Sequence, residues 1–204
     1  MSISNIQTDL ADGVLLINLL EILSSKSIGH YNKKAPLRIQ KLENLNKVMQ
    51  FLKNEGVKLV AISPEDIADG KIKLILGVTW TIILKYQVQP ACGNDEDGMS
   101  PKSAMLQWVN DRVRQFEQNA NNFTTSWNDG RLLTALIFSF NPGVIDLSSI
   151  TREPVVDLER ALTVASEYYD VPKIIDAADM ANSRDELSVL TYVALLRSKV
   201  TTHQ

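Results

Sequence analysis

Residues 8–23 read TDLADGVLLINLLEIL, and residues 125–140 repeat the pattern as TSWNDGRLLTALIFSF. In both stretches an Asp-Gly pair leads into a run of leucines, and equivalent positions lie 117 residues apart. The apolar residues recur with helical spacing, which predicts an amphipathic helix directly after each Asp-Gly pair. Asp at a helix N-terminus and Gly at a tight entry are structural features, so we interpret neither pair as a catalytic site.

The repeat extends well beyond these two helices. Pro64-Glu65-Asp66-Ile67 falls on residues 177–180 and Thr79–Leu84 falls on residues 191–196, while the offset drifts only from 117 to 112. A repeat of about a hundred residues has the size of a small domain and is too long for a solenoid unit. We therefore predict two domains and a connection: a first domain at 1–88, a linker at 89–99 and a second domain at 100–200.

Helical spacing also marks the rest of the chain, and no stretch shows the sustained alternation of a strand, so the predicted fold class is all-α. The segment Lys71–Val88 is apolar on almost every side, which is typical of a helix at the centre of a domain. Ser183-Arg184-Asp185-Glu186 is interpreted as a capping box that opens the last helix. The predicted helices cover residues 12–24, 41–55, 63–69, 71–88, 100–116, 128–140, 157–169 and 183–199.

The two repeats differ at their starts. Only eleven residues precede Asp12, whereas the helix at 100–116 precedes the second Asp-Gly pair. We therefore expect the first domain to lack the leading helix that the second domain has. Without it, Leu16, Leu20 and the helix at 71–88 are expected to expose apolar surface, and the first domain is expected to melt early.

Composition and charge narrow the class of protein. The chain has 204 residues, 45% of them hydrophobic and 22% charged, as in ordinary globular domains. Residues 1–90 carry 11 basic and 8 acidic side chains, a net charge of +3, while residues 91–204 carry 10 and 16, a net charge of −6. This asymmetry indicates an acidic partner for the first domain, although a random split of charge accounts for it as well. The single cysteine, Cys92, fits a reducing compartment, so we expect a cytoplasmic protein.

The sequence does not support catalytic chemistry. The two histidines, His30 and His203, have no partners in a triad or metal-site pattern, and no glycine-rich phosphate loop or calcium loop occurs. We predict a protein that is not an enzyme and that uses no cofactor, no metal and no nucleic-acid partner.

Seven motifs, in order along nearly all of residues 3–199, resemble the calponin-homology (CH) domain. The whole chain resembles the tandem CH pair that forms the actin-binding domain of filamins and alpha-actinins, and Ile6–Leu10 and Lys73–Gly77 resemble filamin more closely. The motifs are Asp9–Gly13, Gly56–Val60, Asp66–Gly70, Lys73–Leu84, Trp127–Gly130, Asp170–Lys173 and Thr191-Tyr192.

The resemblance implies two all-helical domains that bind filamentous actin, mainly through the first domain. The surface around its last long helix and the loop after the leucine helix are the implied contacts. A solvated basic surface is the ordinary explanation for lysines there, but their positions coincide with the family's actin surface. The implied actin-binding residues are Lys33, Lys34, Arg38, Lys58, Asp69, Lys71, Ile72, Lys73 and Leu76.

The resemblance also bears on the contact between domains. Trp80 and Trp108 fall on core-facing positions, and in some family members a Trp at the place of Trp80 meets a basic residue of the second domain. Glu167 occupies that place here, which excludes a cation–π contact there, while Lys173 is a nearby substitute.

Three functions remain open at the level of sequence. The first is a filamin-like actin-binding module at the cytoskeleton of the cell cortex, in a longer protein that dimerises through other regions. The second is recruitment to membranes by anionic phosphoinositides. The third is a signalling adaptor without affinity for actin.

Overall fold

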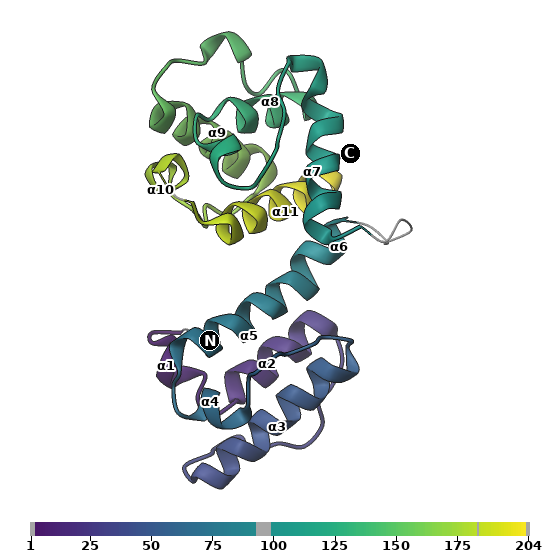
Figure 1. Ribbon diagram of the computed structural model, residues 1–204, viewed down its shortest axis with the longest axis vertical. Coiled ribbons are helices and arrows are strands. Elements are labelled where there is room, and N and C mark those ends of the chain that lie inside the picture. Colours follow the sequence, from purple (N-terminus) through teal and green to yellow (C-terminus); the bar gives the residue numbers. More distant parts are fainter. Residues whose placement is uncertain (1–2, 93–98, 183, 203–204) are drawn as a thin grey trace. The chain divides into compact units, whose positions relative to one another are not determined.

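The computed structural model describes residues 3–92, 99–182 and 184–202, and every regular element within these ranges is helical, which confirms the all-α prediction (Figure 1). The chain divides into two compact units, Met1–Tyr86 and Gln87–Gln204, called unit 1 and unit 2 below. Unit 1 contains α1 (Ile6–Asp9), α2 (Val14–Ser24), α3 (Arg38–Asn54), α4 (Pro64–Ala68) and α5 (Ile72–Ile83). Unit 2 contains α6 (Gln89–Cys92), α7 (Pro101–Val113), α8 (Arg131–Phe140), α9 (Pro154–Tyr169), α10 (Ala177–Asn182) and α11 (Glu186–Thr202). A π-helical turn, Leu84–Val88, follows α5, and 3₁₀ turns occur at Arg114–Phe116, Thr125–Trp127 and Leu147–Ser149.

Each Asp-Gly pair forms the turn that starts its leucine helix. The Asp12 carboxylate accepts a hydrogen bond from the Val14 N–H at 2.9 Å, and the Asp129 carboxylate accepts one from the Arg131 N–H at 3.0 Å. Gly13 has a φ of 77°, in the left-handed region that favours glycine. Both residues of the pair therefore serve the backbone turn.

The same turn lies against the next long helix in each unit. A Cβ atom on Gly13 would lie 2.9 Å from the Asn44 Cβ, and one on Gly130 would lie 3.0 Å from the Asp157 Cβ. Asn44 is 0% exposed and Asp157 is 2% exposed, so both are polar side chains inside a core. The two units thus share one structural feature: a glycine turn packs closely against a buried polar residue of the next long helix.

Asn44 and Asp157 satisfy their hydrogen-bonding groups differently. The Asn44 amide donates to the carbonyls of Asp12 and Asn32 at 2.9 Å each and accepts from the Asn32 N–H at 2.9 Å. Asp157 accepts from the Thr151 N–H at 2.9 Å and from its hydroxyl at 3.2 Å. Each residue ties the preceding loop to its helix, because an unpaired buried polar group would be costly.

The leucine helix of unit 1 exposes a different stripe from the one predicted. Leu16 and Leu20 are 2% and 0% exposed, so the expectation that they face solvent is wrong. They belong to the apolar core that also contains residues of α3 and α5. The exposed residues are their neighbours, Leu19 at 38% and Ile22 at 74%, on the opposite edge of α2.

Helix α5 is less central than its composition predicts. Only Ile75, Val78 and Ile82 of α5 are buried, while Ile72 and Leu76 are 36% and 50% exposed. A helix that is apolar all round but covered on one face leaves apolar side chains in solvent. The prediction of a fully central helix is therefore wrong for one face of α5.

The burial of the tryptophans in the two units also differs from the prediction. Trp127 is 0% exposed, whereas Trp80 and Trp108, both predicted to face a core, are only partly buried. Trp108 stacks on Phe140 with ring centroids 5.8 Å apart, and the Arg197 guanidinium lies 4.8 Å from the Trp108 ring centroid. This cation–π contact holds α7 near α11.

The start of the last helix and the linker are two predicted boundaries on which the structure bears. Ser183 lies outside the described residues, and Asp185 is the residue that caps α11, because its carboxylate accepts from the Leu187 N–H at 3.1 Å. The predicted linker at 89–99 begins with helix α6, since Gln89–Cys92 is helical. The acidic part of that linker, at 94–97, lies outside the described residues.

Candidate functional site

The turn between α4 and α5 gathers several of the predicted actin-binding residues. Asp69 ends α4, Gly70 has a φ of 69°, and Lys71 precedes α5. The Gln7 side chain donates to the Gly70 carbonyl at 3.0 Å, which ties the turn to α1. We call Arg38, Asp69, Lys71 and Lys73 the basic corner.

Carboxylates neutralise part of the basic corner. Arg38, at the start of α3, forms an ion pair with Asp69, and Lys71 pairs with Asp66 at 2.6 Å. The hydrogen bond from Lys71, with two from Ser63, lowers the pKa of Asp66 to about 2. The Arg38 hydrogen bond lowers the pKa of Asp69. The side chains of Arg38 and Lys71 remain 59% and 57% exposed, so an acidic partner can still reach them.

An apolar strip adjoins the basic corner. Ile72 and Leu76 lie one helical turn apart on α5, and both are exposed. The loop after α3 runs beside the same helix, since the Ile62 Cδ1 lies 3.3 Å from where a Gly77 Cβ would be. Val60 in that loop is 81% exposed. The prediction did not include Val60, and the only sequence signal for it was its position in the Gly56–Val60 motif.

The remaining predicted residues lie apart from the basic corner. Lys58 follows the C-terminal end of α3, whereas Arg38 begins that helix, and at about 1.5 Å per residue the helix separates them by about 24 Å. Lys33 and Lys34 are exposed in the loop before Arg38 and line a shallow pocket of about 380 Å³ with Tyr31 and neighbouring residues. The structure thus joins Arg38 to Asp69, while Lys33, Lys34 and Lys58 lie outside the basic corner.

The three residues predicted at the contact between domains are found within their own units. Trp80 is partly buried on α5, and Glu167 is exposed on α9. Lys173 donates to Glu159 at 2.7 Å and to the Thr163 hydroxyl at 2.8 Å. Lys173 is therefore occupied inside unit 2, and a role for these three residues between the units stays a prediction.

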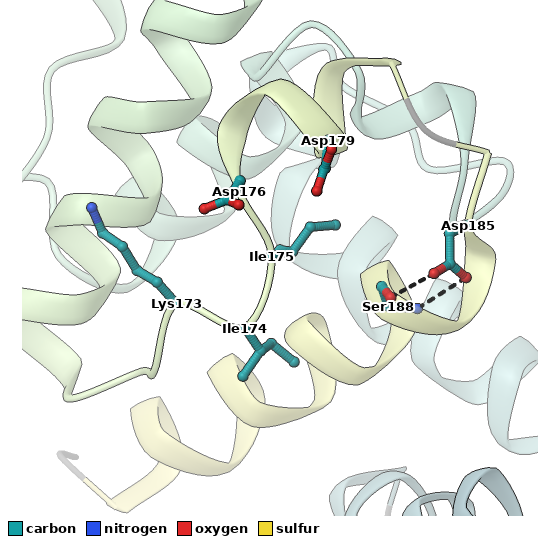
Figure 2. Close-up of a pocket in the computed structure, with 7 residues that line it drawn as sticks. All are labelled: Lys173, Ile174, Ile175, Asp176, Asp179, Asp185 and Ser188. Carbon is teal, nitrogen blue, oxygen red and sulfur yellow. Dashed lines mark hydrogen bonds between the residues drawn. The ribbon is translucent and has the colours of Figure 1, made fainter. Parts of the chain in front are cut away.

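Unit 2 carries an acidic pocket of about 400 Å³ between the segment before α10 and the start of α11 (Figure 2). Asp176, Asp179 and Asp185 line it, with Lys173 as the cation at its edge. Asp185 accepts from the Ser188 hydroxyl at 2.6 Å as part of the cap of α11. Within the described part of the chain, no group of three or more His, Cys, Asp and Glu side chains is placed to hold a metal ion. In the same ranges, no helix combines the length and hydropathy that a bilayer span requires.

Comparison with known proteins confirms the family resemblance. The family model described as "Calponin homology (CH) domain" matches residues 1–88 and 99–202. Alpha-actinin-like protein 1 of Schizosaccharomyces pombe is 34% identical over 95% of this chain and 31% of that protein. Human alpha-actinin-3 is 37% identical over 94% of this chain and 21% of its own length. Filamin-A of Drosophila melanogaster is 36% identical over 95% of this chain and 9% of its own length.

A solved structure shares the fold. The actin-crosslinking core of Schizosaccharomyces pombe fimbrin covers 95% of this chain with a TM-score of 0.80 at 23% identity, and 42% of that core is matched. The chain spans a third or less of the curated relatives named above. Their identities to it, 36% for filamin-A and 37% for alpha-actinin-3, do not favour one parentage, so the closer resemblance to filamin stays a prediction.

Proposed function

Since the chain belongs to the calponin homology family, with one domain match in each half, we propose that it is a non-catalytic module that binds filamentous actin. The observation that carries the proposal is the tandem arrangement itself. Alpha-actinins and a filamin match 94–95% of the chain as one continuous pair, rather than one domain at a time. A lone CH adaptor domain would not produce a match of that length.

We assign most of the binding to unit 1. The basic corner supplies exposed cations, and Ile72 and Leu76 on α5 supply exposed apolar side chains beside them. Long-range attraction between these cations and an acidic filament speeds encounter, and burial of the apolar strip then slows dissociation. Unit 2 offers acidic residues, Asp185 and Glu186, at the corresponding start of its last helix. That difference in charge favours unit 1.

The same proposal has consequences for the longer protein and for its location in the cell. One module binds one filament site, so crosslinking requires a second module, which we place in the longer protein or in a dimer of it. We propose a cytoplasmic location at the actin cytoskeleton of the cell cortex. Anionic phosphoinositides are a second ligand class for exposed lysines, and vesicles containing them measure that affinity separately from actin.

Co-sedimentation with actin filaments tests the assignment. The double substitution Lys71→Glu and Lys73→Glu is expected to weaken binding by about tenfold, or about 1.4 kcal/mol. The matched control is Arg152→Glu with Arg184→Glu, which makes the same change of charge at exposed positions of unit 2. If both double variants lose affinity equally, net charge rather than the unit 1 surface governs binding. Undiminished binding by the first variant, with helix content retained, contradicts the assignment.

A further inference from the structure

Two Ser-Pro pairs, Ser63-Pro64 and Ser100-Pro101, are the only places in the sequence where a serine or threonine precedes a proline. Both serines have an extended backbone and directly precede a helix, Ser63 that of α4 and Ser100 that of α7. A proline disfavours the helical conformation of the residue before it, which accounts for the shared geometry. The two pairs therefore differ mainly in their surroundings.

Ser63 is held by an acidic neighbour. Its N–H and its hydroxyl both donate to one oxygen of the Asp66 carboxylate, at 2.9 Å each, and Lys71 donates to the other oxygen at 2.6 Å. Ser63 itself is only partly exposed. A phosphate on this hydroxyl would lose the hydrogen bond to Asp66 and lie beside a carboxylate, an arrangement that like-charge repulsion disfavours.

Ser100 is open to solvent. It is exposed, as is Met99 before it, and its φ of −65° and ψ of 148° keep the backbone extended. Its hydroxyl accepts from the Ser103 N–H at 3.1 Å and shares a hydrogen bond of 2.9 Å with the Ser103 hydroxyl. Among the described residues, no carboxylate is bonded to this hydroxyl, so the acidic neighbour that holds Ser63 has no equivalent here.

A cation lies two residues after Ser100. Lys102, in the first turn of α7, forms an ion pair with Glu186 at the start of α11, and its side chain is still 46% exposed. A negative group added to Ser100 would therefore compete with Glu186 for Lys102. At Ser63, by contrast, the nearest bonded group is the Asp66 carboxylate.

We propose that Ser100 is a phosphorylation site for a proline-directed protein kinase and that Ser63 is not. Ser100 presents the Ser-Pro pair at the surface, with the serine backbone extended and the hydroxyl bonded only to Ser103. In the reaction, the Ser100 Oγ forms a bond to the γ-phosphorus of ATP, and the bond from that phosphorus to the β,γ-bridging oxygen breaks. ADP leaves, and the hydroxyl proton passes to the catalytic base of the kinase. This inference does not depend on the proposed binding to actin.

The modification is expected to change the contacts of the first turn of α7. A phosphate brings a charge of about −1.5 to −2 and three acceptor oxygens. Because charge-assisted hydrogen bonds are stronger than neutral ones, the phosphate is expected to hold the Ser103 N–H more firmly than the hydroxyl does. It is also expected to draw Lys102 from Glu186, which strengthens the first turn of α7 and weakens its ion pair with α11.

The test incubates the 204-residue chain with a cyclin-dependent kinase and ATP and locates the phosphate by mass spectrometry. We expect Ser100 to be phosphorylated roughly tenfold faster than Ser63, because Ser63 has to give up its hydrogen bonds to Asp66 first. Ser63→Ala is the matched control and is expected to leave the total rate unchanged, whereas Ser100→Ala removes most of it. Pro101→Ala, which retains the acceptor serine, is expected to lower the rate at Ser100. A chain without phosphate at Ser100, or with equal rates at the two serines, overturns the proposal.

Hydrogen exchange then tests the contacts of the phosphate. In the phosphorylated chain, exchange at residues 102–104 is expected to slow by roughly threefold relative to the unmodified chain, because the first turn of α7 gains a charged acceptor. Residues 64–68 of α4 are the internal control and are expected to exchange alike in both forms. Unchanged or faster exchange at residues 102–104 contradicts the contacts assigned to the phosphate.

Discussion

Helices α2 and α8 start from the same Asp-Gly turn but end in different surroundings. All six residues of Leu132–Ile137 are buried in α8, whereas α2 buries Leu16, Ile17 and Leu20 and exposes Leu19. In both units the leucine helix therefore starts at the same glycine turn, packed against a buried polar residue, Asn44 or Asp157. How completely that helix is buried depends on a further helix, α7, which only unit 2 has among the described residues.

The same comparison separates the two surfaces by chemistry. The start of α5 carries Lys71 and Lys73 beside exposed Ile72 and Leu76, while the start of α11 carries Asp185 and Glu186. The start of α5 in unit 1 is therefore basic and the start of α11 in unit 2 is acidic, although both expose apolar side chains, Ile72 and Leu76 in unit 1 and Leu187 in unit 2. The proposal that unit 1 carries most of the actin binding rests on that difference in charge.

Loss of the glycine turn is expected to have the largest effect, and to be equal in the two units. Gly13→Ala and Gly130→Ala each combine an unfavourable left-handed backbone with a Cβ contact of 2.9 or 3.0 Å. We expect each to lower the free energy of unfolding of its own unit by about 3–5 kcal/mol, measured by urea denaturation. Gly29→Ala, at a φ of 85° with open space around it, is the control for the backbone term alone. A Gly13→Ala cost no larger than the control value contradicts the close-contact argument.

Exchanging Asn and Asp at the two buried polar positions, Asn44 and Asp157, is expected to change the free energy of unfolding of the two units unequally. Asn44→Asp removes two hydrogen-bond donors that face carbonyl oxygens, so we expect unit 1 to lose about 2–4 kcal/mol. Asp157→Asn retains an acceptor for the Thr151 N–H but removes the ion pair with Arg160 at 3.4 Å, so we expect unit 2 to lose about 1–2 kcal/mol. Denaturant unfolding with hydrogen exchange resolves the two units. A larger loss for Asp157→Asn than for Asn44→Asp would contradict this account of the hydrogen bonds.

The contact between Arg197 and Trp108 gives a smaller expected difference. Arg197→Met keeps the apolar stem and removes the cation, which we expect to destabilise unit 2 by about 1 kcal/mol. Lys85→Met, at the equivalent position of unit 1, is expected to change stability by less than about 0.5 kcal/mol. Thermal unfolding of both variants measures the difference, and equal shifts would mean that the cation–π contact contributes nothing specific.

The smallest effect concerns acid stability. Because the pKa of Asp66 is lowered to about 2 in the folded state, its ion pair stabilises unit 1 above about pH 4 and is lost as pH falls toward 2. Asp66→Asn is therefore expected to flatten the loss of stability between about pH 4 and 2, as followed by helix content. Asp179→Asn, at the equivalent position of unit 2, is the control, and a parent-like acid profile for Asp66→Asn would contradict the assignment.

The spacing of apolar residues was sufficient to predict where the helices lie, because each helix depends on a pattern within its own segment. Thr8–Leu23 and its repeat predict both leucine helices, and the structure places helices there. Periodicity did not show which apolar stripe of α2 is exposed. Leu16 and Leu19 are chemically identical, and only the cover supplied by other elements distinguishes them.

The candidate site was less predictable because it depends on contacts between distant residues. Arg38 and Asp69 are 31 residues apart, so no local sequence pattern predicts their ion pair. Val60 was missed because an apolar residue in a loop gives no periodic signal. The role of Asn44 could not be predicted from local sequence either, because it depends on carbonyl groups 12 and 32 residues away along the chain.

Hydrogen exchange of the chain bound to actin filaments tests the central claim most directly. If unit 1 carries the binding, filaments will slow exchange at residues 58–61 and 71–76, and residues 171–174 and 184–189 of unit 2 will exchange as in the free chain. Protection confined to the unit 2 segments, or absent from residues 71–76 at saturating actin, would contradict the account.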